Sequence, residues 1–176
     1  MGRICTIQKM QGRLTVEGMM AYTDMMQLAM AQARNAGQRG EVPVGAVVLS
    51  ESGEILSSAY NSVIMHKDPA AHAEILALRE AGRLIGNYRL PGTVLCVTIE
   101  PCIMCMGAII HARVSRVIYG ARDPKWGAAG SLYDFSADAR LNHRPEIISG
   151  VCGAECRELM QAFFRERRMN TAHRQL

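Results

Sequence analysis

The chain has 176 residues, which is enough for one hydrophobic core and too short for two ordinary domains. Hydrophobic residues make up 49% of it, and this share excludes a disordered or fibrous protein. The formal net charge of +4, from 20 Lys and Arg against 16 Asp and Glu, is mildly basic and compatible with a polyanionic partner. We therefore expect one globular domain.

Neither secretion nor membrane insertion is expected. No stretch of about 18 uncharged apolar residues occurs, and residues 1–20 lack the apolar run of a secretory signal. The six cysteines include one CxxC pair, Cys102 and Cys105, which suggests metal or redox chemistry in a reducing compartment. Cys152 and Cys156 share a helix face, so helix packing explains them more simply than a second metal site. We expect a cytoplasmic protein without membrane spans.

The pattern of the chain divides it into three segments. Residues 1–20 show no sustained periodicity and are interpreted as a poorly ordered or peripheral N-terminal extension. Residues 21–168 carry the periodic elements of the expected domain, and residues 169–176 form a C-terminal tail. Basic residues crowd this end, where they either contact nucleic-acid phosphates or solvate a helix face. They are Arg157, Arg165, Arg167, Arg168, His173 and Arg174.

The domain is predicted to begin with a helix and a hairpin. Apolar residues at helical spacing predict a helix over 23–34, with Gly37 as its stop. An apolar run over 42–49, a polar turn and a second run over 55–60 predict two paired strands.

Helices and strands then alternate. Asp68 is placed to cap a helix and Pro69 suits its first position, so a helix is expected from there to about Arg83. The last helix is expected to turn Leu159, Met160, Phe163 and Phe164 inward. The full order predicts an α/β fold, a three-layer α/β/α domain with one mixed sheet of about five strands and helices on both faces. The other predicted elements are strands over 94–99, 114–120 and 145–149, and helices over 101–111 and 154–167.

The sharpest local feature is the segment Pro101-Cys102-Ile103-Met104-Cys105. Pro101 presets the first turn of a helix, and thiols three residues apart share one face, so both sulfurs can reach one ion. The helix N-terminus stabilises the thiolate form that zinc needs. A thioredoxin-type redox pair is the alternative, but such a pair follows the first strand of its fold, whereas this one follows the third predicted strand.

The segment His72-Ala73-Glu74 lies upstream, also near a helix start. His72 and Glu74 are two apart, so on a regular helix they lie on nearly opposite sides and share a site only at its mouth. Alone, such a His is usually structural, and a Glu near a helix start is favoured by the dipole. Together, one His and two Cys give the three ligands of an open catalytic zinc with water in the fourth position. Glu74 then remains beside that water.

An HxE followed by PCxxC resembles the signature of the zinc-dependent nucleoside and nucleobase deaminases. The resemblance implies a cytidine-deaminase-like fold, one Zn²⁺ per chain held by His72, Cys102 and Cys105, and no organic cofactor. Zinc lowers the pKa of bound water from about 15.7 to roughly 7–9. Glu74 would take the water's proton, deliver it to the ring nitrogen as zinc-bound hydroxide attacks, and later protonate the departing ammonia.

Segments beyond these two motifs resemble the bacterial tRNA-specific adenosine deaminases, from about Tyr22 to Arg168. Members of that family convert the wobble adenosine of an arginine tRNA to inosine with release of ammonia. They act as homodimers and bind an anticodon loop with splayed bases. The resemblance therefore implies a tRNA anticodon stem-loop as partner. It rests on Glu41–Ala46, Asp68-Pro69, Asn87–Leu90, Gly107-Ala108, Gly120–Asp123, Gly127–Ser131 and Asn142–Arg144.

The same resemblance implies substrate contacts outside the metal site. Asn61 would contact the target nucleoside, and Phe164 would offer a stacking surface. The alternatives are that Asn61 closes a turn, that Phe164 packs in the core, and that Arg122 and Asp123 pair with each other. The implied substrate-binding residues are Asn61, Ala73, Arg122, Asp123, Asn142, His143, Arg144 and Phe164.

A few positions depart from the family pattern. Ser62-Val63 stands where the family often has Arg-Pro, and Ala70 where it often has Thr, so a nucleotide contact of the missing arginine is in question. Trp126, the only tryptophan, would either stack on a base or cover the dimer contact. Two other functions stay open: a deaminase of small nucleobases or nucleosides with the same zinc site, and a non-catalytic zinc-stabilised RNA-binding module.

Overall fold

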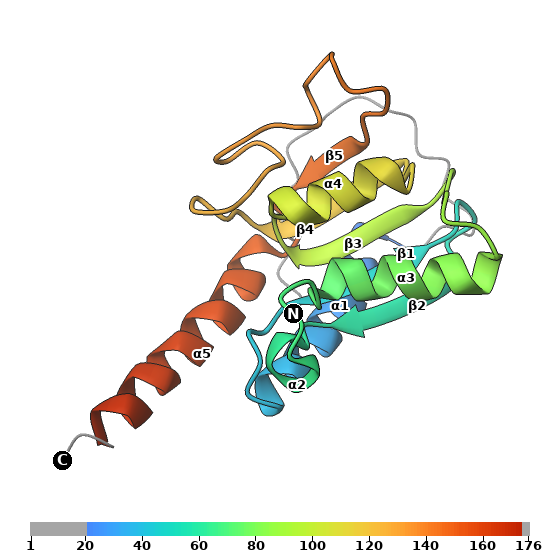
Figure 1. Ribbon diagram of the computed structural model, residues 1–176. Coiled ribbons are helices and arrows are strands. Elements are labelled where there is room, and N and C mark those ends of the chain that lie inside the picture. The colour runs from blue at the N-terminus through green and yellow to red at the C-terminus, as the bar shows by residue number, and fades with distance from the viewer. Residues whose placement is uncertain (1–20, 174–176) are drawn as a thin grey trace.

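A sheet of five strands forms the centre of the computed structural model, which describes residues 21–173 (Figure 1). The strands are β1 (Gly45–Leu49), β2 (Ile55–Tyr60), β3 (Val94–Ile99), β4 (Arg116–Ala121) and β5 (Glu146–Ser149). Their order across the sheet is β2-β1-β3-β4-β5. β1 is antiparallel to both β2 and β3, whereas β3, β4 and β5 run parallel. The prediction of one mixed sheet is confirmed.

Helices cover both faces of this sheet (Figure 1). The helices are α1 (Tyr22–Gln38), α2 (Val63–His66), α3 (Ala73–Ile85), α4 (Ile103–His111) and α5 (Gly153–His173). α1 and the start of α5 pack on one face, and α3 and α4 pack on the other, each over its own apolar cluster. α2 is a short turn of helix between β2 and α3. The predicted three-layer α/β/α architecture is therefore confirmed.

The central strands divide their side chains between the two apolar clusters. In β3, Leu95 and Val97 pack beneath α3 and α4, whereas Val94 and Cys96 pack beneath α1 and α5. Because both faces are covered, the strand is apolar at nearly every position, and this made it visible in the sequence. In β1, Gly45 lets α1 approach closely, since a Cβ there would lie 2.5 Å from the backbone nitrogen of Ala33.

The segment before α3 differs from the prediction. The expected helix start at Asp68 is wrong, because α3 begins at Ala73. Asp68 instead closes a turn, in which its Oδ1 accepts a hydrogen bond from the Ala70 N–H at 2.8 Å. The four-residue α2 was not predicted, since one turn shows no hydrophobic period. It ends at His66, and the C-capping residue Lys67 adopts the left-handed conformation at φ 50°.

The terminal helices are longer than predicted. α1 continues past Gly37, and α5 runs to His173. The prediction that Phe164 faces inward is wrong: it is 42% exposed, because α5 extends beyond the sheet there (Figure 1). The predicted N-terminal extension, residues 1–20, lies outside the described residues. Within residues 21–173, no helix combines the length and apolar composition needed to cross a membrane.

Candidate active site

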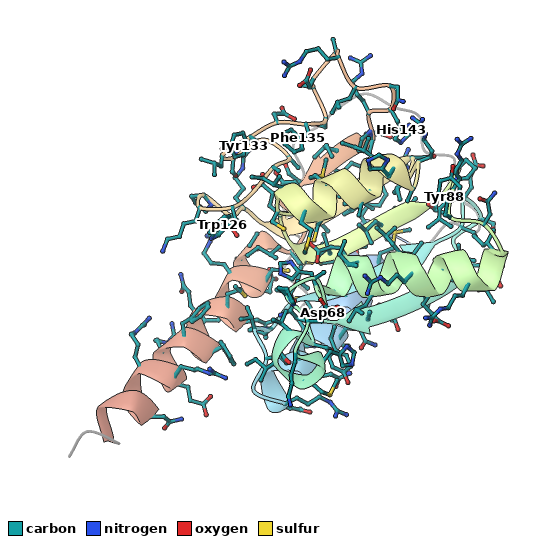
Figure 2. The ribbon with its side chains drawn as sticks, in the orientation of Figure 1. Asp68, Tyr88, Trp126, Tyr133, Phe135 and His143 are labelled. Carbon is teal, nitrogen blue, oxygen red and sulfur yellow. The ribbon has the colours of Figure 1, made fainter. Side chains whose placement is uncertain are left out.

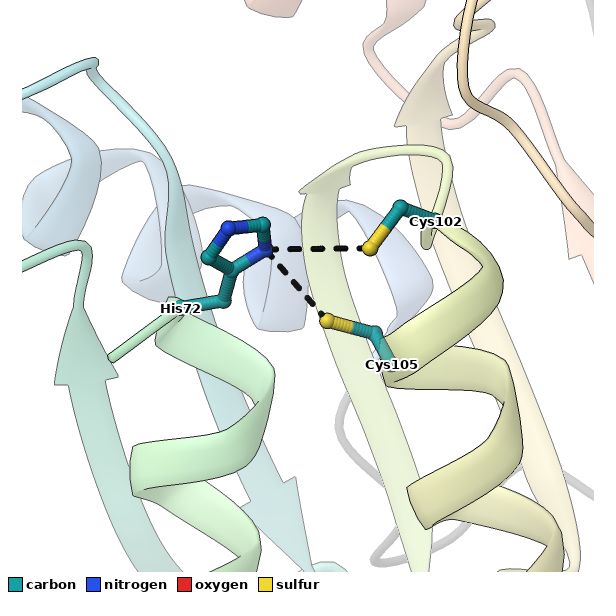
Figure 3. Close-up of side chains that lie close together, drawn as sticks. All are labelled: His72, Cys102 and Cys105. Carbon is teal, nitrogen blue, oxygen red and sulfur yellow. Dashed lines mark hydrogen bonds between the residues drawn. The ribbon is translucent and has the colours of Figure 1, made fainter. Parts of the chain in front are cut away.

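The N-termini of α3 and α4 lie side by side at the end of β3, and His72 points from one toward Cys102 and Cys105 on the other (Figure 3). His72 immediately precedes α3 with extended backbone (φ −72°, ψ 151°), and Glu74 lies in the first turn of that helix. Cys102 precedes α4 in the same way, and Cys105 lies in its first turn. Since His72 stands outside the helix, it does not point away from Glu74, and both can serve one site. The two helix N-termini also bring partial positive charge that favours thiolate and carboxylate groups.

The three predicted ligands come together around one point (Figure 3). Nδ1 of His72 lies 3.8 Å from Sγ of Cys102 and 3.6 Å from Sγ of Cys105, and all three ligand atoms lie within 4.8 Å of one another. In a tetrahedral zinc site, a Zn–S bond of about 2.3 Å and a Zn–N bond of about 2.0 Å separate N and S by about 3.5–3.6 Å. Donor set and spacing therefore fit zinc with three protein ligands.

Hydrogen bonds among the three predicted ligands shift their pKa values. The thiol of Cys105 donates a hydrogen bond to Cys102 and lowers the pKa of Cys102 to about 4, with His72 adding to the effect. The hydrogen bond with Cys102 raises the pKa of His72. The same thiolate raises the pKa of Cys105, and burial adds to this. A cation between the three atoms would replace the protons that they share.

Glu74 is buried beside these ligands, with 2% of its surface exposed. Among the described residues, its Oε2 is the only buried side-chain nitrogen or oxygen that has no hydrogen-bond partner. Burial is the largest cause that raises its pKa. Buried polar atoms are normally paired, so the orphaned oxygen marks the place of a further polar group. A water molecule beside the ligand set fits that place.

A cavity of about 640 Å³ opens at the ligand set. Five of the predicted site residues line it, namely Asn61, His72, Glu74, Cys102 and Asp123. Ile103 and Met104 also line the cavity, although they were not predicted as site residues. Only their location between the two cysteines of the PCxxC motif could have indicated it. The remaining lining residues are Val42, Val44, Pro69, Ile99, Glu100, Ile103, Met104, Trp126 and Met160.

Asp123 and Trp126 belong to the loop after β4. Oδ1 of Asp123 accepts hydrogen bonds from the N–H groups of Lys125 (2.9 Å) and Trp126 (3.2 Å), so it closes the turn that presents the indole. The alternative ion pair between Arg122 and Asp123 does not occur among the described residues. Trp126 is 64% exposed and lies near the N-terminus of α4 (Figure 2), where it lines the cavity.

His143 lies elsewhere, near the C-terminal end of α4 (Figure 2), and its neighbour Asn142 is bound by Arg113, which closely follows that helix. Arg113 donates to Oδ1 of Asn142 at 2.9 Å and to its carbonyl at 3.1 Å. Nε2 of His143 lies 2.7 Å from the carbonyl oxygen of Val114. These contacts fasten the loop before β5 to the end of α4. Of the other implied contacts, Ala73 is buried, while Arg122, Arg144 and Phe164 are exposed and do not line the cavity.

Known proteins share this fold and these motifs. Residues 19–121 match the zinc-binding region of cytidine and deoxycytidylate deaminases. A tRNA-specific adenosine deaminase of Haemophilus influenzae is 46% identical over 144 residues, which are 82% of this chain and 83% of that protein. A tRNA-specific adenosine deaminase of Bacillus subtilis is 44% identical over 81% of this chain and 88% of that protein.

Solved structures of deaminases are also similar to this chain in sequence and fold. A structure from a study of A-to-I editing by tRNA:A34 deaminases at the wobble position of transfer RNA is 43% identical, with a TM-score of 0.75, over 78% of this chain and 99% of that one. A guanine deaminase of Bacillus subtilis is 36% identical, with a TM-score of 0.56, over 58% of this chain and 66% of that one. The chain therefore belongs to the tRNA-specific adenosine deaminases, enzymes built on the zinc-binding region of the cytidine and deoxycytidylate deaminases.

Proposed function

We propose that this chain deaminates adenosine to inosine at the wobble position of an arginine tRNA anticodon and releases ammonia. The observation that carries the proposal is the three-ligand metal set with the unpaired Oε2 of Glu74 at a cavity. An imidazole, two thiolates and one spare carboxyl group are what a hydrolytic zinc deaminase requires. Relatives named tRNA-specific adenosine deaminases support adenosine in tRNA as the substrate.

His72, Cys102 and Cys105 would hold zinc, which supplies an acidified water as the nucleophile. Glu74 is the group that holds and moves protons. Its Oε2 accepts one proton from the water and delivers it to the ring nitrogen of the base. It then takes the remaining proton from the hydroxyl group formed on the attacked carbon and passes it to the amine, which leaves as ammonia. Because burial raises the pKa of Glu74, this carboxyl group is able to carry a proton closer to neutral pH than an exposed one.

The loops around the cavity support a single unstacked base as the bound group. Asn61 follows β2, while Asp123 and Trp126 follow β4, and all three line the cavity. We infer that Asn61 and Asp123 contact the target nucleotide and that Trp126 stacks on a base. The other proposed substrate contacts are Ala73, Arg122, Asn142, His143, Arg144 and Phe164.

The outward side of α4 supports a homodimer. Ile103 and Met104 are 39% and 37% exposed, and a Cβ at Gly107 would meet no atom within 4 Å. An apolar helix face beside the active site favours contact with a second copy. We propose a cytoplasmic homodimer. Sedimentation should give twice the chain mass of 19.3 kDa, and a monomer throughout the micromolar range would refute the dimer.

Inosine formation in a purified anticodon stem-loop tests the function. The substrate is the arginine stem-loop with adenosine at the wobble position, and the control carries that adenosine one position away. We expect inosine only in the first RNA, with binding that weakens steeply as salt rises, because phosphate contacts are screened. Turnover of free guanine without inosine in RNA would refute the proposal, and the likeness to a guanine deaminase makes this the sharpest comparison.

A further inference from the structure

Glu100 is a buried carboxylate next to the metal-binding segment, and the proton chemistry does not use it. It is 1% exposed and stands between the end of β3 and Pro101. Its Oε1 accepts hydrogen bonds from the N–H groups of Ala129 (3.1 Å) and Ser131 (2.9 Å). Its Oε2 accepts one from the N–H of Asp123 (3.1 Å) and one from the Ser131 hydroxyl. All four donors belong to one loop.

This loop, residues 123–131, closes tightly around the carboxylate. Its donors come from both limbs, so Glu100 bridges the start and the end of the loop. A Cβ at Gly127 would lie 2.6 Å from Oε1 of Glu100 and 2.6 Å from the carbonyl oxygen of Asp123. Only glycine therefore fits at this position. The carboxylate organises the loop by hydrogen bonds, while Ala128 and Ala129 of the same loop pack in the apolar cluster beneath α3 and α4.

The same loop is joined to the metal-binding segment. The N–H of Ala128 donates to the carbonyl of Pro101 at 2.9 Å, and Gly127 forms a β-bridge with Cys102. Asp123 lines the cavity from the start of the loop. The loop, Glu100 and the segment that carries two of the three zinc ligands, Cys102 and Cys105, thus form a single hydrogen-bonded unit.

We propose that Glu100 is a positioning residue: it fixes the 123–131 loop against the metal site, so that Asp123 and Trp126 form a rigid wall for the target nucleotide. The nucleotide part of this inference rests on the proposed function. The fixing of the loop does not depend on it. Glu100 acts through the loop and does not itself touch the reacting atoms.

A carboxylate suits this position because it only accepts hydrogen bonds, and all four partners are donors. Glutamine has nearly the same size but replaces one oxygen with an NH₂ group. This group would face a backbone N–H of the loop, and that N–H would lose its acceptor. Among residues 21–173, no Lys or Arg forms an ion pair with Glu100, so this change breaks no salt bridge. Glu100→Gln therefore tests the acceptor role alone.

Trp126 makes the loop directly observable, because it is the only tryptophan of the chain. In zinc-loaded Glu100→Gln we expect a larger fast component in the decay of Trp126 fluorescence anisotropy. Trypsin should cleave after Lys125 at least about tenfold faster, since local opening sets that rate. Ser131→Ala should give intermediate values. Asp138→Asn is the control. The carboxylate of Asp138 accepts hydrogen bonds from Arg140 in an exposed turn, and its loss should leave both the anisotropy decay and the rate of trypsin cleavage unchanged.

Kinetics separate positioning from chemistry. With the anticodon stem-loop, Glu100→Gln should raise KM about tenfold and change kcat less than about threefold, with zinc content unchanged. Loop readouts equal to those of the parent protein would overturn the inference, as would a fall in kcat alone. If Glu100→Gln does not fold, the Ser131→Ala variant decides: an anisotropy decay and a trypsin cleavage rate equal to those of the parent protein would then overturn the inference. If the parent protein makes no inosine, the proposed function fails, while fluorescence and proteolysis still decide whether Glu100 holds the loop.

Discussion

Replacing Glu74 by Gln separates its proton-carrying role from any structural role. Glutamine keeps the size of the side chain but neither takes up nor releases a proton at neutral pH. A positioned acid–base group contributes about 10²–10⁴-fold to a rate, and Glu74 serves more than one transfer. We therefore expect kcat to fall by about 10³-fold or more, which corresponds to about 4 kcal/mol in the activation barrier.

The stability of the protein should not fall with the activity. Glu74 is 2% exposed, its Oε2 has no hydrogen-bond partner among the described residues, and burial raises its pKa, so the folded protein disfavours its charged form. Burying an amide costs less than burying an ionisable carboxyl group. We expect an unfolding temperature equal to or above that of the parent protein, with zinc still near one per chain.

Glu80→Gln is the matched control. Glu80 lies on the exposed side of the same helix α3, where it pairs with Arg83 at 3.3 Å, so the same chemical change should leave activity intact. The assay is single-turnover inosine formation in the anticodon stem-loop, combined with zinc analysis and thermal unfolding. Full activity of Glu74→Gln would refute the proton role. RNA binding without inosine formation by the parent protein as well as the variant would instead favour an RNA-binding module with structural zinc. Loss of zinc would instead assign Glu74 to metal retention.

Three further predictions concern the metal and the core. Cys102→Ala should lose zinc and unfold at lower temperature, whereas Cys156→Ala, on the opposite face of the sheet, should keep its zinc; elemental analysis distinguishes them. Burial raises the pKa of Cys156 to about 12 and raises the pKa of Cys96 further, so both thiols stay protonated and should resist alkylation near pH ~8, as peptide mass mapping would reveal. Gly120→Ala should lower the free energy of unfolding by about 1–3 kcal/mol in denaturant titration. A Cβ there would lie 2.8 Å from the carbonyl oxygen of Thr98.

The metal site could be predicted from sequence because its residues stand at helix starts that leave local marks. Pro101 indicated a nearby helix start, although α4 begins two residues later than predicted, at Ile103, and the CxxC spacing brings the two thiols to one side of its first turn. The sequence could not decide how His72 and Glu74, only two residues apart, serve one ion. The structure resolves this, since His72 lies in extended backbone before α3 and only Glu74 lies within the helix.

The surroundings of the site were less predictable, because turns lack the hydrophobic periodicity by which helices and strands are recognised in a sequence. Asp68 and Pro69 have the residue types of a helix start, yet a side-chain hydrogen bond to Ala70 closes a turn and delays the helix to Ala73. Phe164 follows the apolar spacing of α5, but that spacing cannot reveal that the sheet ends before the helix does.

Buried carboxylates were the least predictable feature, although Glu100 lines the cavity and Glu41 precedes Val42, which also lines it. Glu41 is 2% exposed and accepts a hydrogen bond from the N–H of Met65 at 2.8 Å, which holds α2 just beyond Asn61. Glu100 holds the loop after β4 in the same manner. Acidic residues are usually exposed to solvent, and no feature of the sequence indicated otherwise for Glu41 or Glu100. Neither residue could therefore be assigned to the interior.

Both carboxylates hold their loops mainly through backbone N–H groups, and this has a consequence for specificity. The side chains that face the substrate can change without altering the path of the loop, because the hydrogen bonds do not depend on them. Ser62-Val63 departs from the Arg-Pro that the family resemblance implies, and the N–H of Met65 donates a hydrogen bond to Glu41. The departure at these positions should therefore alter which nucleotides are preferred beside the target, and leave the position of Asn61 and the rate on the target base largely intact.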